Sequence, residues 1–424
     1  MNKPATILTV LVASATVLGC GVGGIAPNFN THPAPSGQSQ ASQGQSSAVG
    51  NSATTVADSN SGSSKPSSNV HSSNSIDSTA ATAKPALGKS SATSGSTSAL
   101  AEMENDLAGQ ETSFTVDFPN STNSGTISAT FTAALSHEPY VNHIISTYQW
   151  SWQGTAVTFR VKYLESKQQT AYVDNYVKGV LNRIVQGNMT DFEKEKVIHD
   201  WIVQHVQYDE SEKNFTAYDA LTTGRAVCQG YSLLAYRMLT DAGIPTDFVT
   251  GTAEGQSHLW NEVYIDGNWY QLDVTFDDPV GDSPSAVSYA YFNLTNRQLA
   301  ANHVWNTAKY PVANTDFDTN LKDLVQSDPS HASQYESILT AIGGNLEIIA
   351  TPSDLASLLS QTFSTRAGSL AVRLQCSTSS VPSFVQQAIA KSRSTVAVST
   401  QYSYVEDARY GSSYSDVNFA FTYR

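Results

Sequence analysis

The chain has 424 residues, a formal net charge of −14 and only three cysteines, Cys20, Cys228 and Cys376. This length allows two domains with accessory segments. The negative charge argues against a nucleic-acid partner, because phosphate binding needs a basic patch. Three cysteines are too few for a disulfide framework. Charged residues make up 14% of the chain, less than the roughly 25% that is usual in soluble domains.

The first twenty residues have the pattern of a secretory signal peptide. Lys3 precedes an apolar run from Ile7 to Leu18, which leads into Val17-Leu18-Gly19-Cys20. This tetrapeptide resembles a bacterial lipobox, which implies cleavage before Cys20 and lipidation of its sulfur. The alternative is an ordinary signal with an incidental cysteine. No other stretch reaches the ~18 consecutive apolar residues of a membrane span. We therefore expect an extracytoplasmic protein that is lipid-anchored to the bacterial cell membrane, or secreted.

Residues 21–111 form a low-complexity segment that is rich in Ser, Ala, Gly and Thr. With almost no aromatic residues, the segment cannot bury enough apolar surface to offset the entropy lost on ordering. We therefore predict a flexible tether, and a folded part that begins near Thr112.

Two small α/β units are predicted on either side of the middle of the chain, at residues 112–165 and 313–424. The first has a strand, a helix and a hairpin at Phe114–Phe118, Pro139–Ile145, Tyr148–Trp152 and Ala156–Tyr163. The same order recurs at Ser369–Leu374, Pro382–Ala390, Val396–Tyr404 and Asp416–Tyr423. The units are either related or coincidental. Their alternating aromatic residues could bind wall polymer, although such residues usually face a core.

Helices are predicted to open the middle of the chain, residues 166–312. Gln168–Val185 is amphipathic, and the next helix begins with a capping box, Thr190 to Glu193. His199 and His205 in that helix do not share a face, so we interpret them as structural rather than metal ligands. Further along, we expect Asp277-Asp278 to lie in a solvated turn. His303 is expected to be a packing residue, with lining of the cleft as the alternative.

Cys228 is predicted to lie in the first turn of a helix. An apolar face follows it at spacings of three and four: Tyr231, Leu234, Ala235, Met238 and Leu239. Gly243 and Pro245 end the helix. At a helix N-terminus, unpaired N–H groups and the helix dipole favour a thiolate, which is the attacking form of cysteine. The alternative is a buried, inert cysteine.

A hairpin after this helix carries two further candidates, His258 and Asp273. The strands His258–Ile265 and Trp269–Thr275 flank Asp266-Gly267, a strong hairpin signal. A two-residue turn puts His258 and Asp273 diagonally on one face, roughly 7–8 Å apart at Cα. A turn one residue longer would place the His258 and Asp273 side chains on opposite faces of the sheet. A carboxylate beside the imidazole would fix its tautomer, and the imidazole could take the proton of a thiol.

The string VCQGYS…GIP…VTGTA…SHLWNEVYIDGNWYQLDVTFDDP resembles the transglutaminase-like (papain-like thiol) superfamily in its bacterial secreted form. The helix TDFEKEKVIHDWIVQHVQYD resembles the leading helix of that family, and SHLWN stands where HAWN is commoner. The resemblance covers residues 170 to 310. It implies that Cys228 is the nucleophile, His258 the base and Asp273 the orienting acid. It also implies an α+β fold, with helices packed on an antiparallel sheet and flanked by small α/β units.

These observations predict a membrane-tethered thiol enzyme that acts on amide bonds of protein or peptide substrates through a thioacyl intermediate. Cell-wall-associated substrates are one option, and both transglutaminase and cysteine peptidase or amidase chemistry stay open. The alternative is a catalytically silent envelope scaffold or adhesion module. No phosphate loop, dinucleotide fingerprint or zinc spacing is found, so we expect no cofactor and no metal. A Cys228–Cys376 disulfide is conceivable and would silence the enzyme.

Overall fold

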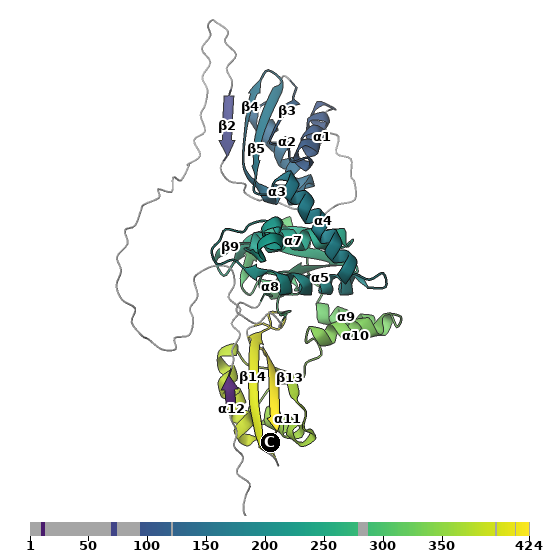
Figure 1. Cartoon of the computed structure of the whole chain (residues 1–424), viewed down its shortest axis with the longest axis vertical. Coiled ribbons are helices and arrows are strands. Elements are labelled where there is room, and N and C mark those ends of the chain that lie inside the picture. Colours follow the sequence, from purple (N-terminus) through teal and green to yellow (C-terminus); the bar gives the residue numbers. More distant parts are fainter. Residues whose placement is uncertain are drawn as a thin grey trace, which may run out of the picture.

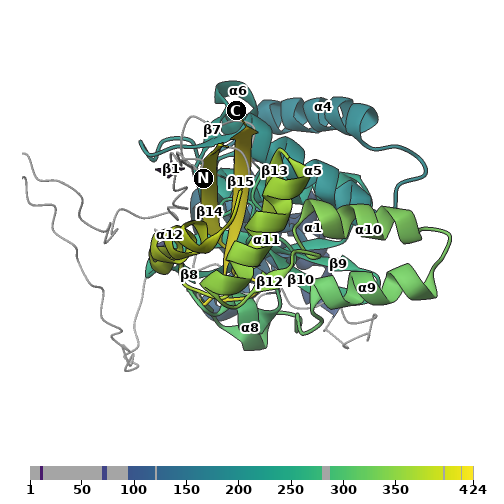
Figure 2. The ribbon, with the colours of Figure 1, turned by 90° about the horizontal axis from the view of Figure 1, so that it is seen from below.

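A computed structural model of the chain describes residues 10–12, 69–73, 94–119, 122–278, 287–394, 397–411 and 413–423. An N-terminal unit, a central domain and a C-terminal unit follow one another along the longest axis of the molecule (Figure 1). Seen from below, α9 and α10 lie to one side of the C-terminal sheet (Figure 2). Among the helices in these ranges, none combines the length and the apolar character that crossing a membrane requires.

The N-terminal unit packs helices on one antiparallel sheet, with the strand order β2-β4-β5-β3. Its elements are β2 (Asn69–Ser73), α1 (Ser94–Ala108), β3 (Ser113–Asp117), α2 (Ser124–His137), α3 (Pro139–Ile144), β4 (Ile145–Gln153) and β5 (Ala156–Tyr163). Phe159 at its centre stacks on Phe114 and Phe131, with ring centroids 5.2 and 5.0 Å apart.

This unit begins earlier than the predicted residue 112. Met103 and Leu107 of α1 are buried in the same core as Phe159, so α1 is part of the fold although it lies in the predicted tether. The sequence also did not predict α2, because its many Ser and Thr residues have modest helix propensity. The side chain of Asn123 caps α2 by accepting the Thr126 N–H at 2.9 Å.

The C-terminal unit repeats the topology of the N-terminal unit. Its elements are β12 (Ile348–Ile349), α11 (Pro352–Thr365), β13 (Ser369–Leu374), α12 (Val381–Lys391), β14 (Val398–Glu406) and β15 (Ser415–Tyr423). In both units a helix and a strand are followed by helical structure (α2 and α3 in the first, α12 in the second) and then by a hairpin, and the first strand pairs antiparallel with the second hairpin strand. Trp150 and Tyr402, opposite Phe159 and Phe419, are buried. These two aromatic side chains therefore face a core.

One strand in the predicted signal peptide also joins a sheet. The strand β1 (Val10–Val12) pairs parallel with β14. Cys20 and the remainder of that segment lie outside the described residues, so the lipid anchor stays a prediction.

The central domain packs helices on an antiparallel sheet with the strand order β10-β9-β8-β11, so the fold is α+β as expected. Its helices are α4 (Lys167–Ile184), α5 (Asp191–His205), α6 (Ala217–Thr223), α7 (Cys228–Asp241) and α8 (Asn296–Leu299). Its strands are β6 (Gln207–Tyr208), β7 (Arg225–Ala226), β8 (Thr246–Ala253), β9 (Gln256–Ile265), β10 (Asn268–Leu272) and β11 (His303–Trp305). The predicted capping box of Thr190 and Glu193 is present at the start of α5.

Helices α9 (Phe317–Ser327) and α10 (Ala332–Ala341) belong to the core of the central domain. The ring of Phe317 contacts those of Phe192 and Tyr270, with centroids 5.6 and 5.4 Å apart, and Tyr335 is buried in the same cluster. The predicted boundary at residue 313 therefore assigned these helices to the wrong unit, because their apolar faces pack on the preceding domain.

A buried ion-pair network fastens the C-terminal unit to α9. Arg409 Nη1 lies 3.1 Å from Asp318 Oδ1, and its Nε lies 2.9 Å from Asp407 Oδ1. Arg373 binds Asp407 from the other side at 2.9 Å and Asp416 at 2.6 Å. The nearby acidic groups raise the pKa of Arg409 above its usual value, although burial acts in the opposite direction. Both guanidinium groups therefore stay charged, and each stabilises buried carboxylates.

We expect Arg409→Ala to lower the free energy of unfolding by about 3–5 kcal/mol, because it leaves buried carboxylates without their cation. Urea unfolding measures the change. Lys194→Ala is the matched control, because Lys194 pairs with Asp191 at an exposed site and such pairs contribute about 0–1 kcal/mol. Equal losses of unfolding free energy in the two variants would contradict the conclusion that the buried network stabilises the contact between the C-terminal unit and α9.

Candidate active site

Cys228 is the first residue of α7, and the residue before it, Val227, caps the helix without a side-chain bond. The Val227 N–H donates to Asn214 O at 2.9 Å, so the loop before α6 positions the start of α7. Asp209 holds this loop by accepting the backbone N–H groups of Ser211 and Asn214 at 3.1 and 3.0 Å. The Ser211 hydroxyl and these N–H groups lower the pKa of Asp209 to about 2. Asp209 therefore organises the loop to which the start of α7 is hydrogen-bonded, next to the nucleophile candidate.

Gly230 brings the first turn of α7 against its neighbours. A Cβ at this position would lie 2.6 Å from the Cβ of Ala226 and 3.0 Å from Thr216 O. No side chain fits at that distance, so the glycine of the string CQG is required for the close approach of α7 to the start of α6.

The hairpin places His258 and Asp273 in direct contact. Ile265 pairs with Asn268 as predicted, and His258 Nε2 lies 2.7 Å from Asp273 Oδ2. The predicted strand to Thr275 is too long, because β10 ends at Leu272. Asp273 turns the chain out of the ladder, and its Oδ1 accepts the N–H groups of Thr275 and Phe276 at 3.1 and 3.2 Å.

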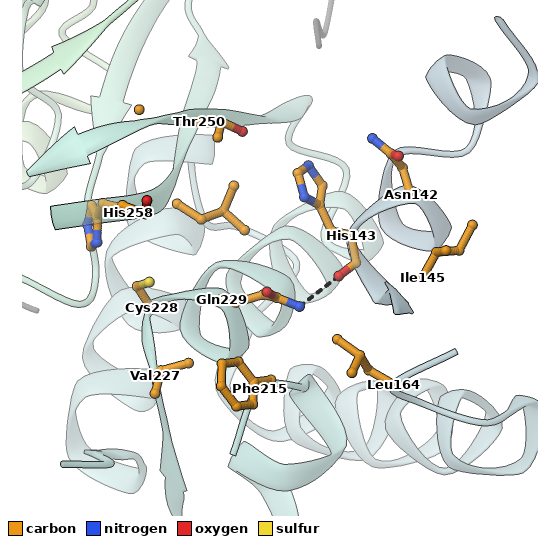
Figure 3. A pocket seen from close by; sticks show the side chains of 13 residues that line it. Asn142, His143, Ile145, Leu164, Phe215, Val227, Cys228, Gln229, Thr250 and His258 are labelled. Carbon is orange, nitrogen blue, oxygen red and sulfur yellow. Dashed lines mark hydrogen bonds between the residues drawn. The ribbon is translucent and has the colours of Figure 1, made fainter. Parts of the chain in front are cut away.

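His258 and Asp273 form a buried, charged pair. Burial alone would lower the pKa of His258, but the charge and hydrogen bond of Asp273, together with those of Cys228, raise it to about 10. Burial would raise the pKa of Asp273, but the two imidazoles that donate to it hold the pKa well below its usual range. An ionised carboxylate only accepts hydrogen bonds, so Nε2 of His258 is the donor. Its Nδ1 is then the nitrogen left to exchange a proton with Cys228, which interacts with this imidazole. Figure 3 shows the two side chains next to each other.

His303 is a second histidine on the same carboxylate, and the sequence did not predict this contact. Its Nε2 lies 2.9 Å from Asp273 Oδ2, and its Nδ1 lies 2.7 Å from Asn302 Oδ1. The strand β11 pairs with β8 so that His303 is opposite Ala253. His303 therefore lies behind Asp273 and does not line the pocket around Cys228. The only sequence signal was a histidine in the short aromatic strand His303-Val304-Trp305.

The His258, Asp273 and His303 side chains have the donor types that a divalent cation prefers, and their ligand atoms lie within 4.8 Å of one another. The same atoms already form the two N–H···O bonds of this cluster. A metal ion would have to replace those bonds, so the arrangement fits a hydrogen-bonded cluster better than a metal site.

The prediction of a solvated turn at Asp277-Asp278 is wrong, because both residues are buried. Asp277 Oδ2 lies 3.1 Å from His199 Nε2 of α5, and Asp278 Oδ2 accepts the Tyr231 hydroxyl of α7 at 2.6 Å. His199 is therefore structural, as predicted. His205 is exposed and stacks on Trp201 at 4.3 Å.

Cys228 and His258 border a pocket of about 380 Å³ between the central domain and the N-terminal unit (Figure 3). The pocket is lined by Asn142, His143, Ile145, Leu164, Phe215, Val227, Cys228, Gln229, Thr250, Gly251, Ser257, His258 and Leu259. Gln229 Nε2 donates to His143 O at 2.7 Å and so joins α7 to α3. Within the described residues neither Cys228 nor Cys376 forms a disulfide, so the conceivable bridge between them is not present.

Residues 178–274 match the sequence model of the transglutaminase-like superfamily. The kyphoscoliosis peptidases of Homo sapiens and Mus musculus are each 29% identical to this chain, over 170 and 177 residues. These matches cover 34% of this chain and 26% and 27% of the relatives, so the chain spans about a quarter of their length. Comparison with solved structures finds a crystal structure of a TGase, with a TM-score of 0.25 and 15% sequence identity. The match covers 42% of this chain and 54% of the TGase chain.

Cys228 should react as a thiolate at acid pH, because the protonated His258 beside it keeps its proton up to a pKa of about 10. Burial raises the pKa of Cys376, which is therefore an internal control. An ordinary thiol is less than about 1% thiolate at pH 6, so we expect iodoacetamide to alkylate Cys228 on the order of 100-fold faster than Cys376. Mass spectrometry of each cysteine peptide measures the two rates. Equal rates in the folded protein would contradict the prediction that Cys228 is a thiolate.

His303→Ala should raise the pKa of His258. Without His303, the Asp273 carboxylate accepts a hydrogen bond from only one imidazole, so its negative charge stabilises protonated His258 more strongly. Titration of the histidine ring nitrogens by NMR measures this shift. His303→Gln keeps an N–H donor and should therefore give a smaller shift in the pKa of His258. An unchanged or lowered pKa of His258 in His303→Ala would show that His303 only fills space.

Proposed function

Because residues 178–274 make this chain a member of the transglutaminase-like superfamily, we propose that it is a thiol enzyme that attacks amide bonds of proteins or peptides. Cys228 is the nucleophile, His258 the general base and acid, and Asp273 the group that orients His258. The observation that carries this proposal is the buried bond of 2.7 Å between His258 and Asp273, beside a cysteine that begins a helix.

In the first step the Cys228 thiolate attacks the amide carbonyl carbon, and the carbonyl oxygen becomes an oxyanion. The N–H groups of the first turn of α7 point out of the helix N-terminus, so the Cys228 N–H is suited to stabilise that oxyanion. His258 then donates its Nδ1 proton to the departing nitrogen. The C–N bond breaks, an amine or ammonia leaves, and a thioester to Cys228 remains.

In the second step an amine or a water molecule attacks the thioester carbonyl. His258 Nδ1 now accepts the proton of the attacking group, and the C–S bond breaks to return Cys228 as a thiolate. An amine gives a new amide bond, as in transglutaminase chemistry, and water gives hydrolysis. Asp273 stays ionised throughout, because its donors hold its pKa well below neutral pH.

The charged state of the cluster favours an enzyme over a silent scaffold. Burying a carboxylate and an imidazolium is costly unless each has partners, and a scaffold gains nothing from keeping both beside a cysteine. We further propose that a lipid on Cys20 holds the enzyme at the outer face of the bacterial membrane, where envelope proteins or peptides are the available substrates.

Cys228→Ala should abolish turnover without unfolding the protein. We expect a loss of at least about a thousandfold, because removing the nucleophile of a triad leaves only binding and oxyanion stabilisation. The assays are incorporation of a labelled amine into dimethylcasein, and ammonia release from the same protein. Cys376→Ala is the matched control and should keep both activities. Equal turnover by Cys228→Ala and the wild type would overturn the proposal.

A further inference from the structure

Two large apolar side chains are exposed at the rim of the pocket beside Cys228. Leu164 is 42% exposed and Phe215 is 37% exposed, and both line that pocket. Single exposed apolar residues are common on proteins. Two at the mouth of one pocket, next to the proposed nucleophile, suggest a surface that a ligand covers.

The backbone holds both residues in place, so their exposure does not come from a loose loop. The Leu164 N–H donates to Ile144 O at 2.7 Å, at the end of α3. The Phe215 N–H donates to Asp219 Oδ2 at 3.1 Å, within the cap of α6. The rim of the pocket is therefore preformed.

Away from the Cys228–His258 pair, the pocket lining offers no charged partner. Among the described residues that line it there is no Lys, Arg, Asp or Glu, and Ile145, Val227 and Leu259 add buried apolar surface. Burial lowers the pKa of His143 to about 4, so this histidine is neutral near pH 7. A charged side chain that entered would lose its hydration without compensation.

The N-terminal unit supplies one wall of the pocket, opposite Cys228 (Figure 3). The hydrogen bond from Gln229 to His143 O fixes this wall to α7, and the His143 ring packs on Phe248 at 4.3 Å. Asn142 and Thr250 lie along the same pocket and add polar groups that can bind a peptide backbone.

We propose that this pocket binds an uncharged, apolar side chain of the peptide residue next to the attacked amide, and that Leu164 and Phe215 select it. The inference rests on the proposed function, because it assigns the pocket to the substrate of Cys228. Under this proposal, the N-terminal unit helps to determine which substrates the site accepts.

The test uses the full-length chain and three peptidyl chloromethyl ketones that differ only in one side chain, Leu, Asp or Lys. The Cys228 thiolate displaces chloride: a C–S bond forms, the C–Cl bond breaks and chloride leaves. This reaction needs a reactive thiol but no turnover. Each rate is divided by the rate with iodoacetamide, which has no side chain for the pocket. We expect the Leu probe to react about tenfold or more faster than the charged probes.

Charge variants at the rim sharpen the test. Leu164→Lys should raise the relative rate of the Asp probe about tenfold, and Leu164→Glu that of the Lys probe. Val312→Lys is the matched control, because Val312 is 64% exposed and does not line the pocket, and it should leave all three rates unchanged. Unchanged iodoacetamide reactivity shows that each variant keeps the site intact.

Two negative outcomes separate this inference from the proposed function. If iodoacetamide labels Cys228 rapidly but the three probes react at equal relative rates, or the rim variants do not change the preference, the pocket is not the subsite and the thiol enzyme stands. If Cys228 reacts no faster than Cys376 with iodoacetamide, the proposed function fails, and the subsite fails with it.

Discussion

The site depends on one buried carboxylate, Asp273. An isolated charge in the interior is costly, and Asp273 is compensated by N–H donors from His258, His303 and the turn at Thr275 and Phe276. These donors come from three separate parts of the chain, so the charge can be buried only when β9, β11 and the turn after β10 are all in place. The same bonds set the tautomer of His258 and direct its Nδ1 towards Cys228. The stability of the fold and the geometry of the site are thus coupled through one side chain.

Helix α7 connects that carboxylate to the remainder of the domain. Gly230 packs against α6, Ser232 donates to Leu259 O at 2.8 Å, and Tyr231 donates to the buried Asp278. The start of the helix is therefore held on several sides, and Cys228 is presented from a rigid element. Rigid support of this kind is what a nucleophile needs, because small displacements from the reacting geometry reduce rates strongly.

The two flanking units share a topology but have different roles towards the site. The N-terminal unit reaches the pocket through His143, whose carbonyl binds Gln229 next to Cys228. The C-terminal unit is fastened through Arg409 and Asp318, on α9 rather than at the pocket. In the proposed enzyme the first copy contributes to specificity, whereas the second is joined to the domain by a charged network. The two units thus share one topology but contact the central domain through different interfaces.

The sequence by itself determined the features that depend on near neighbours. Helical spacing after Cys228, the Asp266-Gly267 turn and the resulting register of His258 are local, and so are the strands and hairpins of the two repeated units, whereas α1 and α2 were not predicted. Only the tertiary structure decided what lies far apart in the chain. It brought His303 to Asp273, buried Asp277 and Asp278 against α5 and α7, moved α9 and α10 into the central core, and set the N-terminal unit against the nucleophile. Local periodicity and turn chemistry do not encode such contacts, because these contacts depend on which surfaces the folded elements bury together.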